Sequence, residues 1–459
     1  MKINGYEFYG NYIPMKHQEH TIKFMLANKR GYVLNDMGTG KTASCLWFAD
    51  ILMTLGKIRK VLIIAPLSTL RSVWVKDILE VCPYRKYHVV HGSREERAVM
   101  LKDDANFYIT NTDAPRNFFQ ELMELKPDVI IIDEITSFAN SSSKRSKAMQ
   151  SLARNCLSVY GLSGNPTAGG LMQSYGIAKV VLPGNLPTPY MSKYRDMILY
   201  QVNLYEYVPK EGATRIVNKV LSPAIRYKLE DCVDLPPINF IYRSVDLPAP
   251  TMKLFREMLE HQIAEYKEGL ITAQTAGVKA IRLMQILTGS TKDVDGNIHL
   301  VDITPKLLDL LSIYYEAGMK LVVFAQSVKT VQIIRDFFRS KGVHAEHIWG
   351  DVSLKERDRI ISDFQTKSEG VLCAQVKTMS HGVTLTKAHT LVFFGPVAGN
   401  ETYRQAIRRI RRISQKHKQT VIRLISTKFE KRAFEKLDQM EFTSQEVMDM
   451  YNEGIDAFL

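Results

Sequence analysis

Short runs of apolar residues recur along the chain, and helix-like segments separate most of them. In the first half these runs predict strands at 32–35, 61–65, 107–110, 129–132 and 158–162. In the second half they predict strands at 321–325, 346–349, 370–373, 390–394 and 421–425. Strands that alternate with helices form βαβ units, and these units build parallel sheets. The pattern therefore predicts an α/β fold with two parallel sheets in tandem.

The region between the two series of strands has a different pattern. Residues 183–305 contain frequent prolines and a long helical pattern from about 251 to 287, with no evident ladder of strands. A chain of 459 residues suits two or three domains. We therefore expect an α/β lobe at 1–182, a helical insertion and linker at 183–305, and a second α/β lobe at 306–459.

Composition indicates a soluble globular protein, with 45% hydrophobic and 24% charged residues. No apolar run reaches the roughly 18–20 residues that a membrane helix needs, and the first residues lack the apolar stretch of a secretory signal. The five cysteines are scattered without CxxC spacing, which favours reduced thiols over a zinc site or a disulfide framework. We therefore expect a cytoplasmic protein with no membrane partner.

The formal charge of +13 is unevenly distributed along the chain. Residues 404–432 contain eleven lysines or arginines and one acid, Glu430. Such a basic segment favours a polyanionic partner, with nucleic acid first. A solvated basic face without any partner is the alternative that charge alone leaves open.

A glycine-rich turn follows the first predicted strand and precedes a helical pattern. Its sequence, residues 35–42, is Asn-Asp-Met-Gly-Thr-Gly-Lys-Thr. The backbone N–H groups of such a turn and the start of the following helix hold phosphates. Lys41 would reach the β- and γ-phosphates of ATP, and the Thr42 hydroxyl would bind Mg²⁺. The turn lacks the glycine that usually opens the longer phosphate-binding pattern, so a structural glycine turn is the alternative for this motif alone.

Two carboxylates follow the apolar run 129–132, namely Asp133 and Glu134. Four consecutive β-branched residues suit a strand that is buried on both faces, and ligands bind at the carboxyl ends of such strands. Asp133 would hold the Mg²⁺ shell, and Glu134 would orient or deprotonate the attacking water. An Asp-Glu pair is often only solvated surface, but its position about 90 residues after a phosphate-binding turn favours an ATPase.

The order of these motifs resembles that of superfamily 2 helicases and translocases, and within them the Swi/Snf family of DNA-dependent ATPases. The resemblance extends over residues 14–427. It implies two RecA-like parallel-sheet lobes in tandem, with a helical inter-lobe insertion. Residues 14–18 resemble the leading segment of the family, in which Gln18 would read the adenine. The phosphate loop would bind the nucleotide through Met37, Gly38, Thr39, Gly40, Lys41 and Thr42.

Further segments match other family motifs. Residues 65–69, followed by Trp74, resemble motif Ia, a nucleic-acid contact at the end of a strand. Residues 162–166 resemble motif III, which couples hydrolysis to the nucleic-acid track. The chain departs from the family at Thr136, where a His is usual, and at Asn165, where a Thr is usual. Coupling is therefore expected to be altered rather than lost.

The second half resembles the family at motifs V and VI. Residues 382–388 are similar to motif V, in which Gly382 would contact the nucleotide. Residues 405–415 resemble motif VI, the most specific of the set. On a helix Gln405, Arg409 and Arg412 fall on one face. The resemblance implies that these side chains act across the cleft on the γ-phosphate, so that catalysis depends on lobe closure.

The resemblance also implies contacts with the nucleic-acid backbone, which position the protein without reading sequence. The expected contact residues lie in motif Ia, at the end of the predicted strand 107–110, in the loop 141–147 and among the basic residues of the second lobe: Ser68, Thr110, Lys144, Arg145 and Lys377.

We therefore predict an ATP- and Mg²⁺-dependent enzyme that translocates on or remodels duplex or branched DNA. Its short length resembles a bacteriophage or bacterial member of the family, which implies the cytoplasm of a bacterium or an infected host. One alternative is a helicase that depends on single strands or RNA. Another, of a different class, is a non-catalytic scaffold that binds nucleic acid.

Overall fold

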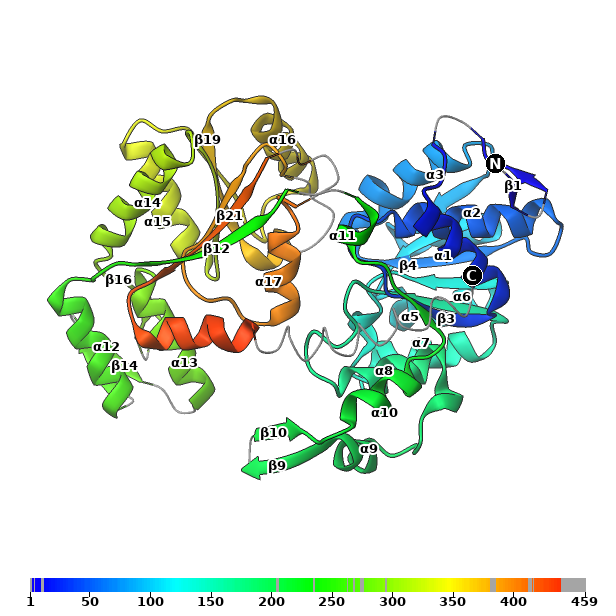
Figure 1. The fold of residues 1–459 in the computed structure, drawn as a ribbon, viewed down its shortest axis with the longest axis horizontal. Helices are drawn as coiled ribbons and strands as arrows, with labels where there is room; N and C mark the ends of the chain where they lie inside the picture. The colour runs from blue at the N-terminus through cyan, green and yellow to red at the C-terminus, as the bar shows by residue number, and fades with distance from the viewer. Residues whose placement is uncertain are drawn as a thin grey trace. The chain divides into compact units, whose positions relative to one another are not determined.

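The computed structural model describes residues 2–3, 5–9, 12–203, 206–233, 236–261, 263–266, 269–272, 276–293, 295–379, 385–411, 415 and 417–438. These residues form two compact units (Figure 1). The first contains the described residues up to Val233, and the second those from Pro236 to Asp438. None of the described helices combines the length and the hydropathy that a bilayer-spanning segment requires.

The first unit is built on a seven-stranded parallel sheet of order β11-β3-β8-β7-β4-β6-β5. Its strands are β3 (Arg30–Val33), β4 (Val61–Ala65), β5 (Tyr87–Val89), β6 (Phe107–Asn111), β7 (Val129–Ile132), β8 (Ser158–Leu162) and β11 (Ala224–Ile225). Two hairpin strand pairs lie outside this sheet, β1 (Lys2–Ile3) with β2 (Tyr6–Glu7) and β9 (Leu199–Asn203) with β10 (Glu206–Pro209).

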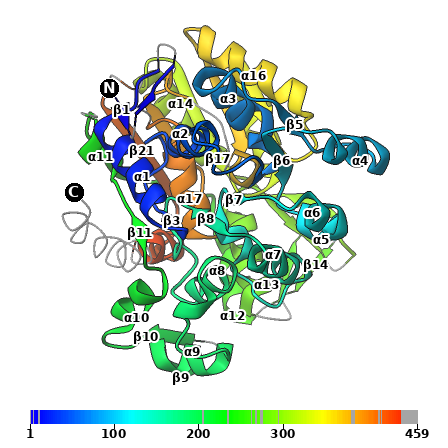
Figure 2. The ribbon, with the colours of Figure 1, turned by 90° about the vertical axis from the view of Figure 1, so that its right-hand side faces the viewer.

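Helices cover both faces of the first sheet (Figure 2). Val129 and Ile131 of β7 belong to one core with α1 and α2, whereas Ile130 and Ile132 belong to another with α7 and α8. A strand that is buried on both faces needs such an uninterrupted apolar run. The helices are α1 (Lys16–Ala27), α2 (Lys41–Thr54), α3 (Lys76–Val81), α4 (Arg94–Lys102), α5 (Ala114–Asn117), α6 (Phe119–Leu125), α7 (Lys144–Arg154), α8 (Gln173–Val181), α9 (Met191–Ile198), α10 (Ala213–Val220) and α11 (Leu229–Cys232).

The second unit contains a six-stranded parallel sheet of order β12-β21-β20-β17-β19-β18. Its strands are β12 (Ile238–Ser244), β17 (Lys320–Ala325), β18 (Ala345–Ile348), β19 (Gly370–Gln375), β20 (Thr390–Phe393) and β21 (Gln419–Ile425). Its helices are α12 (Ala249–His261), α13 (Ala276–Leu287), α14 (Thr304–Glu316), α15 (Val328–Ser340), α16 (Leu354–Thr366) and α17 (Asn400–Ile407). The prediction of an α/β fold with two parallel sheets is confirmed.

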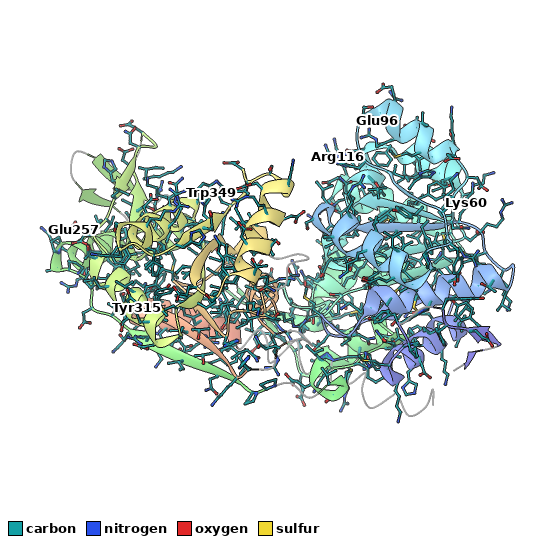
Figure 3. All side chains as sticks on the ribbon, turned by 90° about the horizontal axis from the view of Figure 1, so that it is seen from above. Lys60, Glu96, Arg116, Glu257, Tyr315 and Trp349 are labelled. Carbon is teal, nitrogen blue, oxygen red and sulfur yellow. The ribbon has the colours of Figure 1, made fainter. Side chains whose placement is uncertain are left out.

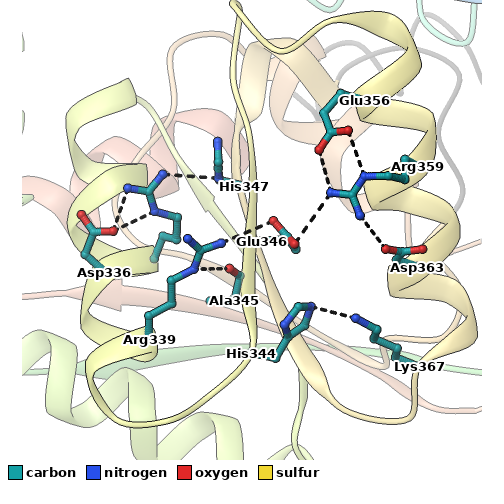
Figure 4. Close-up of polar contacts among 11 residues, drawn as sticks. Asp336, Arg339, His344, Ala345, Glu346, His347, Glu356, Arg359, Asp363 and Lys367 are labelled. Atoms are coloured by element: carbon teal, nitrogen blue, oxygen red, sulfur yellow. Dashed lines mark hydrogen bonds and ion pairs between the residues drawn. The ribbon is translucent and has the colours of Figure 1, made fainter.

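Charged side chains surround β18, the edge strand of the second sheet (Figure 4). The Glu346 carboxylate lies 3.5 Å from Nη2 of Arg339 on α15 and 4.0 Å from Nη2 of Arg359 on α16. Charges on an exposed edge discourage pairing with a strand of another molecule. Elsewhere on the surface Glu96, Arg116 and Tyr315 are also exposed (Figure 3).

The segment 183–305 contains strands where the sequence analysis expected helices. β11 joins the first sheet and β12 joins the second, pairing along its whole length with β21. Both strands lie close to prolines and pair with residues far away in the sequence, so local periodicity did not reveal them. The domain limits at 182 and 305 stay a prediction.

The single helix predicted at 251–287 is wrong. α12 and α13 are separate helices, and the strands β13 (Ile263–Tyr266) and β14 (Gly269–Thr272) lie between them as an antiparallel pair. β-Branched and aromatic residues favour a strand here, and Gly269 weakens a helix. A further antiparallel pair, β15 (Ser290–Lys292) and β16 (Ile298–Leu300), follows α13.

Candidate functional site

The phosphate-binding turn predicted from the sequence joins β3 to α2. Gly38 and Gly40 have φ angles of +93° and +77°, a region that favours glycine. A Cβ atom on Gly40 would lie 2.0 Å from Nε2 of Gln18. Because α2 begins at Lys41, the N–H groups of its first turn lack acceptors within the helix and point toward the turn. This geometry suits an anion such as a phosphate.

Lys41 and Thr42 occupy the first turn of α2, and both are half-buried. The Lys41 ammonium donates to the carbonyl oxygens of Asn35, at 2.8 Å, and Asp36, at 3.1 Å. These bonds hold a positive charge over the turn. The structure therefore brings together the lysine, the hydroxyl and the glycines that the sequence predicted for this site.

Asp133 and Glu134 follow the buried strand β7 at its carboxyl end. The backbone N–H of Asp133 donates to Ile64 of the neighbouring strand β4 at 2.8 Å. One carboxylate oxygen of Asp133 accepts from the backbone N–H of Glu134 at 3.1 Å, and the other accepts from the indole Nε1 of Trp74 at 3.1 Å. Glu134 has a φ of +50°, an unusual conformation for a residue with a side chain that occurs often at functional sites.

The candidate metal ligands at this edge of the sheet are oxygen atoms. The Thr42 hydroxyl and the Asp133 carboxylate are hard oxygen ligands, which fit Mg²⁺. Cys45 lies behind the turn on α2 and is fully buried. Burial raises the pKa of the Cys45 thiol, which favours its protonated form. The donor set therefore favours a hard cation.

The start of α1 packs against the phosphate-binding turn. Gln18 is 2% exposed; its Oε1 accepts from Met15 N at 2.8 Å, and its Nε2 donates to Thr39 O at 3.3 Å. His17 Nε2 also lies 2.8 Å from Thr39 O, and a carbonyl only accepts, so Nε2 carries the proton. Burial lowers the pKa of His17 and keeps its ring neutral. The adenine contact of Gln18 stays a prediction.

A second group of contacts holds the turn, and the sequence did not predict it. The Asp36 N–H donates to Tyr227 O at 2.9 Å, and the Asp36 carboxylate accepts from Leu229 N at 3.3 Å. The fully buried Arg226 lies 3.8 Å from the same carboxylate. No local signal reveals these contacts, because β11 reaches the turn from about 190 residues further along the chain.

The motif III segment forms a buried turn after β8. Asn165 is 7% exposed, and its Oδ1 accepts from the N–H of Thr167 at 3.1 Å and from its hydroxyl at 3.3 Å. The Ser163 hydroxyl accepts from Asn165 N at 3.1 Å. This turn lies at the same edge of the sheet as Asp133, since β8 and β7 are adjacent and parallel.

The expected nucleic-acid contacts of the first unit differ in exposure. Ser68 is half-buried and Lys144 is exposed. Arg145 is half-buried and donates to Ser137 O at 2.8 Å and to Asp113 Oδ1 at 3.3 Å.

Thr110 differs from these residues because it is fully buried. Its hydroxyl donates to Val90 O at 3.0 Å. The structure therefore does not support the prediction that Thr110 touches a nucleic acid. Asn111, the last residue of β6, and Thr112 after it are half-buried.

Motif VI of the second unit departs from the helical prediction. α17 ends at Ile407, so Gln405 lies in its last turn and Arg409 lies beyond it. Arg409 is fully buried, and its carbonyl accepts from Leu385 N at 2.8 Å. The prediction that Gln405 and Arg409 share one helical face is therefore wrong. After Ile407 the backbone continues in tighter turns, in which Arg409 N donates to Ala406 O at 3.1 Å and Ile410 N donates to Ile407 O at 3.3 Å.

Two predicted residues of the second unit, Gly382 and Arg412, lie outside the described residues. Lys377 is exposed in the short helix η5 (Val376–Met379).

A buried arginine that the sequence analysis missed holds α17 in place. Arg423 on β21 is 4% exposed, and its Nε donates to the hydroxyl of Tyr403 on α17 at 2.8 Å. Its other nitrogens bind Tyr242 and the Asp438 carboxylate at 2.7–2.9 Å. This residue thereby connects β12, β21 and α17.

Two known families match the sequence. The SNF2-related domain matches residues 17–295, and the helicase conserved C-terminal domain matches residues 303–414.

Curated relatives match most of the chain at low identity. Chromodomain-helicase-DNA-binding protein 1-like from Danio rerio is 24% identical, over 88% of this chain and 40% of that protein. An uncharacterised ATP-dependent helicase from Mycoplasma genitalium is 25% identical, over 90% of this chain and 40% of that protein. Protein p41 from Acyrthosiphon pisum secondary endosymbiont phage 1 is 26% identical, over 87% and 88%. The chain thus spans less than half the length of the first two relatives.

A solved structure resembles the chain as well. It is the Sulfolobus solfataricus SWI2/SNF2 ATPase core in complex with double-stranded DNA. The TM-score is 0.46 at 21% identity, over 98% of this chain and 96% of that one.

Proposed function

The chain belongs to the SNF2-related domain family, and from this premise we propose that it is a DNA-stimulated ATPase that translocates on or remodels duplex or branched DNA. One observation carries the proposal. A single edge of the first sheet collects the phosphate-binding turn, with Lys41 and Thr42, and the carboxylates Asp133 and Glu134. Open parallel sheets bind ligands at this edge.

The residues of the first unit have distinct roles in the proposed reaction. The start of α2 and the Lys41 ammonium bind and neutralise the β- and γ-phosphates of ATP. Thr42 and Asp133 hold Mg²⁺, which neutralises phosphate charge when bound. Glu134 orients the attacking water and accepts its proton. Since phosphoryl transfer depends mostly on positioning, the fixed orientation of both carboxylates favours catalysis.

We further propose roles for the second unit in the same reaction. Arg412 stabilises the charge of the transferred phosphoryl group, the buried Gln405 and Arg409 position it, and Gly382 contacts the nucleotide. Lys377 adds a basic contact for the nucleic-acid backbone. Contacts with phosphates make binding non-specific, so affinity for DNA falls steeply as salt rises.

The first test is steady-state ATP hydrolysis without nucleic acid and then with duplex DNA, forked DNA, single-stranded DNA or RNA. A Glu134→Gln variant is the control, because it keeps the side-chain shape and removes the base. We expect stimulation by duplex or forked DNA that disappears in the variant. Stimulation by single strands or RNA alone would instead identify an unwinding helicase. No turnover under any condition would favour a non-catalytic scaffold.

A further inference from the structure

The indole of Trp74 contacts the carboxylate of Asp133 within the first unit. Its Nε1 donates to Asp133 Oδ2 at 3.1 Å, and the whole side chain is 0% exposed. The two residues are 59 positions apart in the sequence. We propose that Trp74 is a positioning residue for the metal-binding carboxylate and makes its orientation depend on the turn at 66–69. This inference rests on the proposed function.

The bond from Trp74 is one of the contacts that orient the Asp133 carboxylate. The second oxygen, Oδ1, accepts from the N–H of Glu134, so a neutral donor binds each carboxylate oxygen. Groups that bind a metal ligand from behind fix its orientation, and their loss weakens metal affinity. A buried indole N–H is also costly to leave unpaired, which favours one rotamer for both side chains.

The backbone around Trp74 connects it to a candidate nucleic-acid contact. Residues 66–69 form a turn that contains the short helix η1 (Leu67–Thr69), and the π-helix η2 (Leu70–Val75) follows directly. The Ser72 hydroxyl donates to Ser68 O at 2.7 Å, and Thr69 Oγ1 donates to Pro66 O at 2.9 Å. Ser68 and Trp74 therefore belong to one continuous hydrogen-bonded segment.

The direction in which the Trp74 side chain points depends on the conformation of the π-helix η2, which contains it. A π turn contains one residue more than an α turn, and such turns occur often at functional sites. Tightening η2 to an α-helix would rotate the following residues by roughly 100°, the step of one residue. The hydrogen bond from Trp74 Nε1 to Asp133 Oδ2 would then break. The conformation of η2 therefore links the segment at Ser68 to the hydrogen bond between Trp74 and Asp133.

The test compares two tryptophan-to-phenylalanine variants. Trp74→Phe keeps an aromatic ring and removes the N–H donor. Trp47→Phe is the matched control, because Trp47 is also 0% exposed and its Nε1 makes no hydrogen bond within the described residues. For both variants we would measure the Mg²⁺ concentration that half-saturates binding of a fluorescent, non-hydrolysable ATP analogue, and then the stimulation of hydrolysis by duplex DNA.

We expect Trp74→Phe to raise the half-saturating Mg²⁺ concentration by roughly tenfold, while Mg²⁺-independent analogue binding stays as in the control. Stimulation by DNA should fall further than in Trp47→Phe. Equal Mg²⁺ requirements in the two variants would overturn the inference. If wild type shows no DNA stimulation, the proposed function fails, and the Mg²⁺ comparison still decides the role of Trp74.

A second measurement covers the case in which Trp74→Phe does not fold. The chain has three tryptophans, so Trp47→Phe combined with Trp349→Phe leaves Trp74 as the only one. Its fluorescence should change when Mg²⁺ is added to the protein with the ATP analogue, because charge next to the indole N–H changes. An unchanged spectrum at saturating Mg²⁺ would contradict the inference.

Discussion

At the scale of single residues, the phosphate-binding turn depends on glycines that no other residue replaces without cost. Gly40 combines a positive φ with the close approach of Gln18. Gly56, at the end of α2, has a φ of +68°, but a Cβ atom there would meet nothing within 4 Å. A substitution at Gly56 therefore tests backbone strain alone, whereas a substitution at Gly40 tests strain together with crowding by Gln18.

Gly40→Ala is expected to abolish nucleotide binding, whereas Gly56→Ala should keep it. Both variants should lose about 1–2 kcal/mol of unfolding free energy because an alanine is strained at positive φ, and Gly40→Ala should lose more because its Cβ also displaces Gln18. Binding of a fluorescent ATP analogue and thermal unfolding would measure these effects. Wild-type affinity in Gly40→Ala would show that the turn does not hold the phosphates.

His17 makes the stability of the folded chain depend on pH. Its pKa is lowered by burial from the ordinary value of 6.5, so the unfolded chain binds the proton more tightly than the folded chain. The stabilisation by neutral His17 is therefore complete above pH 6.5 and is lost as the pH falls through the window below it. Burial lowers the pKa of His20 as well, which acts in the same direction.

We expect the thermal unfolding temperature to fall between about pH 7 and pH 5.5 more steeply in wild type than in His17→Gln. Glutamine keeps a donor for Thr39 but does not titrate. Thermal unfolding at several pH values in buffers of constant ionic strength would measure the difference. Parallel pH profiles would show that His17 does not contribute to it.

At the scale of elements, a buried ion pair braces the second unit. Lys306 Nζ on α14 lies 2.8 Å from Glu430 Oε1, and both side chains are 0% exposed. The second oxygen of Glu430 accepts from Ser426 N at 2.6 Å, just after β21. The pair thus connects the start of α14 to the chain that follows β21.

Lys306→Met is expected to lower the unfolding free energy of the second unit by about 3–5 kcal/mol, because it leaves a buried carboxylate without its partner. Lys431→Met is the control, since the pair of Lys431 with Glu435 is half-exposed and worth at most about 1 kcal/mol. Urea denaturation would compare the two. A loss in Lys306→Met no larger than in Lys431→Met would refute the bracing role.

At the scale of the whole molecule, two α/β units carry different parts of the proposed reaction. The first contains the turn, the lysine and both carboxylates, and the second contains motif VI. Under the proposed assignment of motif VI to the γ-phosphate, hydrolysis depends on both units, whereas nucleotide binding depends mainly on the first.

Arg412→Ala should therefore keep ATP binding and lose hydrolysis by a factor of about 10³ or more. Arg432→Ala, an exposed site with the same change of charge, should leave both unchanged. Analogue binding and steady-state turnover with duplex DNA would separate the two effects. If turnover survives in Arg412→Ala, the assignment of this arginine to the γ-phosphate is wrong.

Features encoded within a few residues could be predicted from the sequence. The strands β4, β7 and β8 have the predicted limits. In β4 and β7 a continuous apolar run defines a buried strand locally. The glycines of the turn and the carboxylates after β7 could be recognised for the same reason. Motif VI was only partly correct, because the chain leaves the helix after Ile407 and buries Arg409, which the local pattern does not contain.

The sequence by itself determined two α/β units, the glycine-rich turn before α2 and the position of Asp133 and Glu134 at the end of a strand. Local backbone chemistry encodes each of these. Only the tertiary structure decided that Trp74 binds Asp133, that Arg226 approaches Asp36 and that β12 pairs with β21. These contacts join residues 59 or more positions apart, and they follow from how the sheets order their strands, which local periodicity does not contain.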